Sequence, residues 1–160
     1  MNALPNELVF KGFRTLLREL LFGPSGDEIW IINREDKGLI GQLRALSAAQ
    51  ASRELIPGRA SIAGHANHVV FHLGLLNRAL RGENSFAGAD WAGSWKTGVM
   101  TEERWQAVLS DIERQTDTWL SVLEKELDWD PLGLTGTFAG LAHVAYHFGA
   151  VRQLVGLLQG

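Results

Sequence analysis

Apolar side chains recur every three or four positions along most of this chain, which is the spacing of one face of an α-helix. The clearest stripes cover residues 6–22, 61–81, 102–127 and 137–158. Four helices of this length, each with one apolar face, bury those faces by packing side by side. The sequence therefore predicts an all-α, antiparallel four-helix bundle of up-and-down type, built as a single domain over residues 1–160.

The segment between the first two stripes has a less regular pattern. EIWIINRED at 28–36 fits either a short strand or an irregular crossing segment, and the pattern does not decide between them. Short additional helices are expected between 36 and 56, with Ser47 as the N-cap of one of them.

Two later breaks separate the remaining helices. Gly82 is expected at the C′ position of the second long helix, and a long loop follows at 83–100. Loops of this length inside compact domains are more often functional than incidental. Its tryptophans Trp91 and Trp95 are expected either to plug the end of the bundle or to wall one side of a pocket. The Asp-Pro pair at 130–131 is interpreted as the break before the last helix.

Composition excludes several classes of function. The chain has no cysteine, which removes disulfides, cysteine-based zinc sites and a protein thiol nucleophile. A net charge of −3 without a Lys/Arg cluster argues against a nucleic acid or an anionic membrane surface as the partner. No signal peptide or run of transmembrane length is visible. We therefore expect a soluble cytoplasmic protein that acts on a small molecule.

The five histidines are confined to two of the predicted helices. His65, His68 and His72 lie in GHANHVVFHLG, and His143 and His147 lie in LAHVAYHFGAV. Positions three and four apart share one face of a helix, so each stretch forms a ridge of imidazoles. If the two ridges face each other, their side chains converge on one point, which is how helix bundles build metal sites.

The surroundings of these histidines favour a metal over ordinary hydrogen bonding. No acid lies between Glu54 and Glu83, and none follows Asp130. Unpaired imidazoles in an apolar core would each cost about 1–3 kcal/mol. A lone core histidine is usually satisfied by the backbone or a hydroxyl, but two facing ridges fit a divalent ion such as Zn, Ni, Cu or Fe better.

Other metal chemistries fit the pattern less well. A di-iron carboxylate bundle needs Glu-x-x-His motifs and bridging glutamates, which are absent. HExxH is absent too, and a haem explains neither a third ligand nor the ridge. Three neutral imidazoles would leave the ion its full charge and open positions, as in a Lewis acid that activates water, a thiol or a carbonyl.

Nearly the whole chain resembles the DinB/YfiT-like superfamily of metal-binding four-helix bundles. The similar segments are DKGLIGQLRALSAAQAS at 36–52, SIAGHANHVVFHLGLLNRALRGE at 61–83, DWAGSW at 90–95 and LAHVAYHFGAVRQ at 141–153. The last segment is the most specific, because members carry there a histidine pair spaced by four, followed by glycine and often Arg-Gln.

The resemblance implies a set of metal ligands. The pair maps onto His143 and His147, and the single ligand from the second long helix is expected fourteen residues before Gly82, which selects His68. If His72 took that place, the register would shift by one turn, about 5.4 Å.

The remaining expectations also follow from the resemblance. His65 and His72 are expected to line the pocket as extra histidines. Characterised relatives include thiol-dependent S-transferases and isomerases, which implies a metal-dependent transferase or isomerase acting with a low-molecular-weight thiol. The alternative is a non-catalytic metal- or small-ligand-binding protein of a stress response. A homodimer is the expected assembly.

A few residues of the last helix carry predictions of their own. Tyr146 is expected to pack against another helix, and Arg152 to form a salt bridge or to contact the carbonyls of the helix end. Gly140, Gly149 and Gly156 each lower helix stability by up to about 1 kcal/mol relative to alanine. Their presence predicts close contact with a neighbouring helix or with a second subunit.

Overall fold

The computed structural model describes residues 6–125 and 130–160, and these residues fold almost entirely as helices. The long helices are α1 (Asn6–Phe22), α4 (Ile62–Ala79), α5 (Glu102–Leu123) and α6 (Pro131–Gln159). The short ones are α2 (Gly38–Arg44), α3 (Ala48–Ala51) and the 3₁₀ turn η1 (Gly93–Trp95). No strand forms within the described ranges, and the only β-type pairing there is an isolated bridge between Ser25 and Glu28. The all-α prediction is confirmed.

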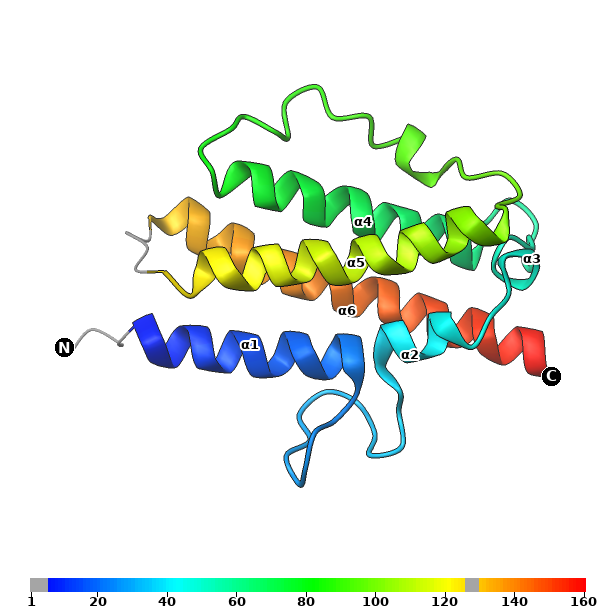
Figure 1. Cartoon of the computed structure of the whole chain (residues 1–160), viewed down its shortest axis with the longest axis horizontal. Helices are drawn as coiled ribbons and strands as arrows, with labels where there is room; N and C mark the ends of the chain where they lie inside the picture. Colours follow the sequence, from blue (N-terminus) through cyan, green and yellow to red (C-terminus); the bar gives the residue numbers. More distant parts are fainter. Residues whose placement is uncertain (1–5, 126–129) are drawn as a thin grey trace.

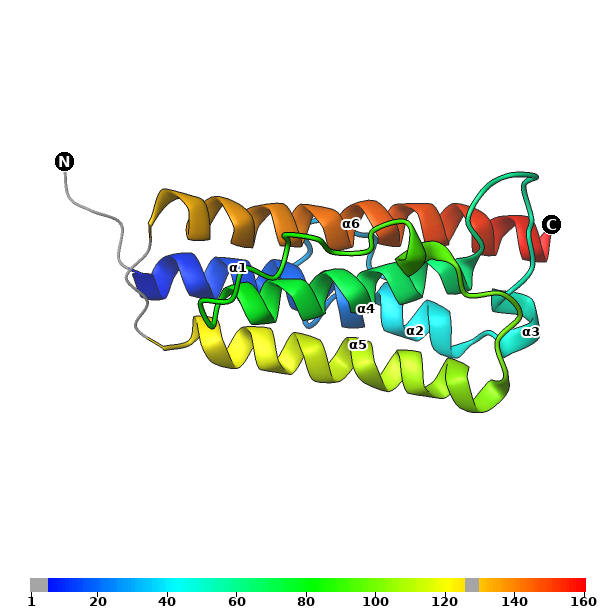
Figure 2. The same ribbon diagram turned by 90° about the horizontal axis from the view of Figure 1, so that it is seen from above.

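The long helices lie side by side along the long axis of the molecule (Figure 1). Helix α4 packs against both α5 and α6, whereas α1 packs against α6 and α2. Seen from two directions, α1 and α2 follow one another along one side of the molecule (Figures 1 and 2). The expected short helices between 36 and 56 are therefore present, and α2 continues the side that α1 begins.

The predicted up-and-down order is wrong for the middle pair of helices. α4 and α5 run in the same direction, opposite to α1 and α6 (Figure 1). Parallel neighbours cannot be joined by a short turn, because the chain must return to the starting end. Residues 83–100 make this return along the outside of α4, where η1 packs against that helix.

The last helix begins earlier than predicted. The Asp130-Pro131 pair does not separate the chain from a helix that starts at 137, because α6 already begins at Pro131. The Asp130 carboxylate caps the helix by accepting a 2.6 Å hydrogen bond from the Gly133 N–H. Proline suits the first turn because its missing N–H has no partner to lose there.

The other helix ends agree closely with the sequence. Ser47 is the N-cap of α3 and forms a capping box with Gln50. Gly82 adopts φ 84° two residues after the C-cap Leu80, one position later than expected. Helix α5 ends at Leu123, and positions 126 and 127 of its predicted range lie outside the described residues.

The core fills the space between the helices and is rich in leucine and tryptophan. Trp105 and Trp119 are fully buried, and the Trp105 indole donates a 3.0 Å hydrogen bond to the Leu46 carbonyl. This bond ties the segment before α3 to α5. Over the described residues, no helix is at once long enough and apolar enough to cross a membrane.

Of the three glycines singled out in α6, only Gly140 makes a close contact. A Cβ atom at Gly140 would lie 2.6 Å from Leu76 Cδ1 and 2.8 Å from the ring of Trp119. The prediction of close packing is confirmed at this position. A Cβ at Gly149 or Gly156 would meet no atom of the described chain within 4 Å.

A buried glutamate holds the irregular segment that follows α1. Glu19 is 4% exposed, and its carboxylate accepts hydrogen bonds from the N–H groups of Trp30, Ile31 and Ile32 at 2.8–3.1 Å. Residues 28–36 therefore form an irregular crossing segment, one of the two predicted alternatives. Burial raises the pKa of Glu19, but the three N–H donors lower it by more, so the net pKa lies below 4.5.

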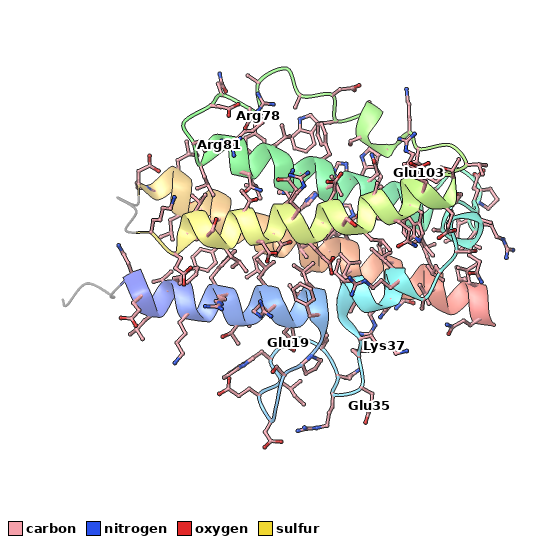
Figure 3. The ribbon with its side chains drawn as sticks, viewed as in Figure 1. Glu19, Glu35, Lys37, Arg78, Arg81 and Glu103 are labelled. Atoms are coloured by element: carbon pink, nitrogen blue, oxygen red, sulfur yellow. The ribbon has the colours of Figure 1, made fainter. Side chains whose placement is uncertain are left out.

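We predict that Glu19→Gln lowers the free energy of unfolding by about 2 kcal/mol, because a buried charged acceptor of backbone hydrogen bonds is lost. Urea unfolding at pH 7 measures the change. Glu35→Gln is the matched control, since Glu35 is exposed on the same segment (Figure 3). A group with a depressed folded pKa stabilises the fold above its unfolded pKa. The difference between wild type and Glu19→Gln should therefore shrink as the pH falls below 4.5, and an undiminished difference would contradict the assignment.

Candidate metal centre

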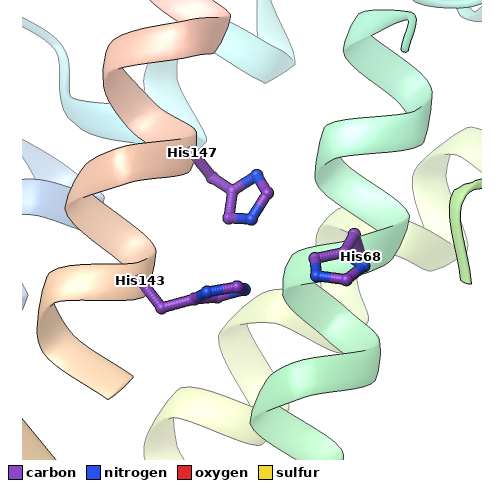
Figure 4. Close-up of side chains that lie close together, drawn as sticks. All are labelled: His68, His143 and His147. Carbon is purple, nitrogen blue, oxygen red and sulfur yellow. The ribbon is translucent and has the colours of Figure 1, made fainter. Parts of the chain in front are cut away.

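The antiparallel helices α4 and α6 bring three of the five histidines together. His68 projects from α4 towards His143 and His147, which lie one turn apart on α6 (Figure 4). The ring centroid of His68 lies 5.2 Å from that of His143 and 5.0 Å from that of His147. One nitrogen from each ring can be chosen so that all three lie within 4.8 Å of one another. The three residues selected from the sequence therefore share one point.

Burial leaves ring nitrogens of this cluster without hydrogen-bond partners. His68 is 4% exposed and His147 is fully buried. The Nε2 atoms of His143 and His147 are buried, and neither forms a hydrogen bond with the described residues. Such orphaned atoms are uncommon in folded proteins, and two of them facing a third imidazole fit a bound cation.

The third imidazole, that of His68, has its tautomer set by a hydroxyl from the 83–100 segment. His68 Nδ1 lies 2.6 Å from Ser94 Oγ, and the Ser94 hydroxyl donates its single proton to the Trp91 carbonyl at 2.6 Å. The hydroxyl can then only accept from His68, so Nδ1 must carry the proton. His68 Nε2 is left with its lone pair free, as a metal ligand requires.

His65 plays the corresponding part for His147. The two Nδ1 atoms lie 2.9 Å apart, so one of them donates to the other. When His147 uses Nε2 as a ligand, its Nδ1 carries the proton and donates to His65 Nδ1. His65 thus contacts a ligand from outside, in agreement with its expected place as an extra histidine of the pocket.

His72 lies beside the cluster and outside the convergent group. Its ring stacks on His143 with centroids 3.9 Å apart, and its Nδ1 is buried without a partner among the described residues. The geometry brings His68, and not His72, together with the α6 pair. The alternative register, shifted by one turn, is therefore disfavoured.

The two loop tryptophans cover the triad. Trp95 stacks on His68 with centroids 4.0 Å apart, and the Trp91 ring lies 6.0 Å from His68. The Asn67 amide donates a 2.7 Å hydrogen bond to the Ser94 carbonyl and fastens η1 to α4. Of the two predicted alternatives, the tryptophans wall the histidine cluster rather than plug the end of the molecule.

The histidines lie in surroundings that keep them neutral. Burial, with His143 and His65 nearby, lowers the pKa of His68 to about 4. Burial, with four neighbouring histidines, lowers the pKa of His147 to about 3. Burial alone lowers the pKa of His143. The triad is therefore deprotonated at neutral pH, which is the form that binds metal.

The sequence predictions for two other residues of α6, Arg152 and Tyr146, have different outcomes. Arg152 forms a 3.2 Å salt bridge with Asp36, one of its two predicted alternatives. Tyr146 is 68% exposed and does not pack against another helix, so that prediction was wrong. Tyr146 lies about 100° around α6 from His147, and its ring meets the His147 ring edge-on, with centroids 5.1 Å apart.

Comparison with known families, curated proteins and solved structures found no match for this chain. The function of this chain is therefore inferred from the chemistry of the site. Its donor set is three neutral imidazoles, and no carboxylate of the described residues joins the convergent group. Such a set does not neutralise the charge of a divalent ion, and it leaves at least one coordination position open.

Ser94 is the part of the site that sequence reasoning missed. It is one hydroxyl in a segment that also carries Ser85 and Thr97. Nothing in the order of residues along the loop distinguishes the hydroxyl that reaches His68 from the others. The one signal in the sequence was the unusual length of the segment itself.

We predict that Ser94→Ala changes the tautomer of His68 in the metal-free protein. Wild type should show the Nδ1-protonated form at pH 7, and the variant a mixture, because loss of one hydrogen bond removes about 1 kcal/mol of preference. Nitrogen-15 NMR of the imidazole ring reports this directly. Ser85→Ala is the matched control, since Ser85 is equally buried in the same segment but donates to the Leu75 carbonyl. An unchanged His68 spectrum in Ser94→Ala would contradict the proton assignment.

Proposed function

We propose that this protein is a metal-binding protein of the DinB/YfiT-like four-helix-bundle type, in which His68, His143 and His147 hold one divalent ion. The observation that carries the proposal is the convergence of the three imidazoles, two of which have buried Nε2 atoms without hydrogen-bond partners among the described residues. The resemblance of the sequence to that superfamily supports the same three residues. Zn, Ni, Cu and Fe are all compatible with imidazole ligands.

We further propose that the site serves a metal-dependent transferase or isomerase that acts with a low-molecular-weight thiol. The ion, when bound, supplies a Lewis acid that favours the thiolate form of a small thiol. The residues of the chain provide the remainder of the site. Ser94 and His65 orient two of the ligand rings, and Trp91 and Trp95 keep water away from them. A chain without cysteine leaves the thiol to a cosubstrate.

One observation favours the alternative, a non-catalytic metal- or small-ligand-binding protein of a stress response. Two of the three ligand residues are almost completely buried, and Trp95 lies directly on one of them. A substrate would have little room to approach these two ligands unless the 83–100 segment moves. Binding without turnover needs no such movement.

The expected homodimer stays a prediction. Gly149 and Gly156 lie on an exposed part of α6 where a Cβ would meet nothing in the described chain. A second copy of α6 could approach there closely.

We predict that the protein, purified without chelators or a nickel column, contains about one metal ion per chain. His68→Ala, His143→Ala and His147→Ala should each abolish tight binding, because each leaves two ligands of the triad. His65→Ala should keep the ion with an affinity lowered by about 10–100-fold, as expected when an outer partner of a ligand is lost. Elemental analysis gives the stoichiometry, and circular dichroism verifies that each variant is helical.

His72→Ala is the internal control of this series, because His72 stacks on His143 without joining the group. It should retain the ion. Loss of metal from His72→Ala together with retention in His68→Ala would show that the register is wrong by one turn. Retention in all five single variants would refute the histidine site.

We predict that the metal-loaded protein accelerates the attack of a low-molecular-weight thiol on a chromogenic aryl halide by at least about tenfold over the metal-free protein. The rate is followed by absorbance with a panel of small thiols. His143→Ala, checked for helicity, serves as the control for adventitious metal. Equal rates in the loaded and metal-free forms would refute the thiol-transfer proposal and leave the binding alternative in place.

A further inference from the structure

A second candidate site lies beside the triad. A cleft of about 620 Å³ opens between the start of α4, the later part of α6 and the segment that precedes α4. Its polar lining comes from Arg59, His65, Tyr146 and Gln153, and Trp95 is the largest apolar residue in the lining. Volumes of this size are typical of small-molecule sites in proteins.

The cleft is separated from the histidine triad by side chains that line the cleft and contact the triad from the other side. None of the three triad residues lines it. His65 and Trp95 do line it, and on their other sides they contact His147 and His68, respectively. A molecule in the cleft would therefore touch the partners of the ligands without touching the ligands themselves.

The charged side chains that line the cleft are positive only. Arg59 is the only Lys, Arg, Asp or Glu side chain in its lining. Its guanidinium is exposed and forms no salt bridge or side-chain hydrogen bond with the described residues, unlike Arg44, Arg78 and Arg114, which each pair with an acid. The nearest acid along the segment, Glu54, lies outside the lining, and its carboxylate is occupied by the Gly58 N–H at 2.6 Å.

The backbone reinforces this positive character. Ala60 lines the cleft and immediately precedes Ser61, the N-cap of the 18-residue helix α4. The first turn of a helix carries a partial positive charge that favours anions nearby. The other end of the cleft is formed by Gln153 and Leu154, which lie before the last turn of α6, so the partial negative charge of that helix end is more distant.

The rest of the lining suits an organic body rather than a bare inorganic ion. The Tyr146 side chain is 68% exposed. Its ring and that of Trp95 offer flat apolar surfaces, while the Tyr146 hydroxyl and the Gln153 amide offer hydrogen bonds. A single arginine with one amide matches one carboxylate or phosphate group.

We infer that this cleft binds a small organic anion, with its carboxylate or phosphate on Arg59 and its apolar body against Trp95 and Tyr146. The inference goes beyond the proposed metal function and does not depend on it, because no triad residue contributes to the cleft. It assigns the chain a second ligand site, next to the partners of the metal ligands.

Titration of the nitrogen-15-labelled full-length protein tests the inference. Benzoate and phenyl phosphate are the probes, and benzamide is the uncharged analogue of benzoate. We expect the amide resonances of Arg59, Ala60 and Ala150 to shift together and to saturate with a millimolar dissociation constant, as for a fragment-sized ligand. Benzamide should bind more weakly. Added sodium chloride should weaken benzoate binding, because the guanidinium is exposed to screening.

Arg59→Gln should raise the dissociation constant of the anion by about fivefold, the upper range for an exposed charge pair. Arg53→Gln is the matched control, because Arg53 is exposed six residues earlier and lies outside the lining. It should bind like wild type. If neither anion shifts these amides, if benzamide binds as tightly as benzoate, or if Arg59→Gln binds like wild type, the inference is wrong.

A last arm separates this inference from the proposed metal function. The same titration in His143→Ala, which lacks one triad ligand, should give the wild-type dissociation constant. Unchanged anion binding in a variant that has lost its metal supports the cleft as an independent site. Loss of anion binding there would overturn its independence from the triad, whatever the metal content of the wild-type protein.

Discussion

The antiparallel packing of α4 against α6 determines where every part of the histidine site lies. Along this contact, residue numbers rise in α4 as they fall in α6. His65 meets His147, His72 stacks on His143, and Leu76 fills the space that a side chain at Gly140 would need. His68 lies between the first two pairs and so faces both residues of the α6 pair. Because Gly140 has no side chain, Leu76 and the Trp119 ring can pack directly against α6 at this point.

The convergence of the triad could be predicted from the sequence because it depends mainly on helical periodicity. Residues four apart on an amphipathic helix share a face wherever the helix is placed. Two ridges of histidine with no acid nearby on either helix are typical of a shared metal site. The choice between His68 and His72 needed the register of α4 against α6, and the sequence alone reached it only through a family resemblance. The structure supplies that register from the packing at Gly140 and Leu76.

Other features could not be predicted from patterns of single residues. The apolar stripes of α4 and α5 look the same whether the two helices run parallel or antiparallel. The relative direction of these helices therefore could not be predicted from the stripes. The start of α6 was misplaced because Asp-Pro both ends and begins helices, and only the cap from Asp130 to Gly133 decides which. Tyr146 was misplaced because its angular position on α6, about 100° from His147, does not say whether another helix lies beside that face. Ser94 was missed because its partner lies 26 residues away in sequence.

The parallel arrangement of α4 and α5 has a consequence for how this site is enclosed. When two consecutive helices run in the same direction, the segment that connects them must span the full length of one helix. In this chain the connecting segment passes over the histidines. It includes Ser94, Trp91 and Trp95, which contact His68. The cover of the site is thus a product of topology, not an appended lid. Insertions or substitutions in residues 83–100 are therefore expected to change access to the three imidazoles and the orientation of their rings while the helices themselves stay unaltered.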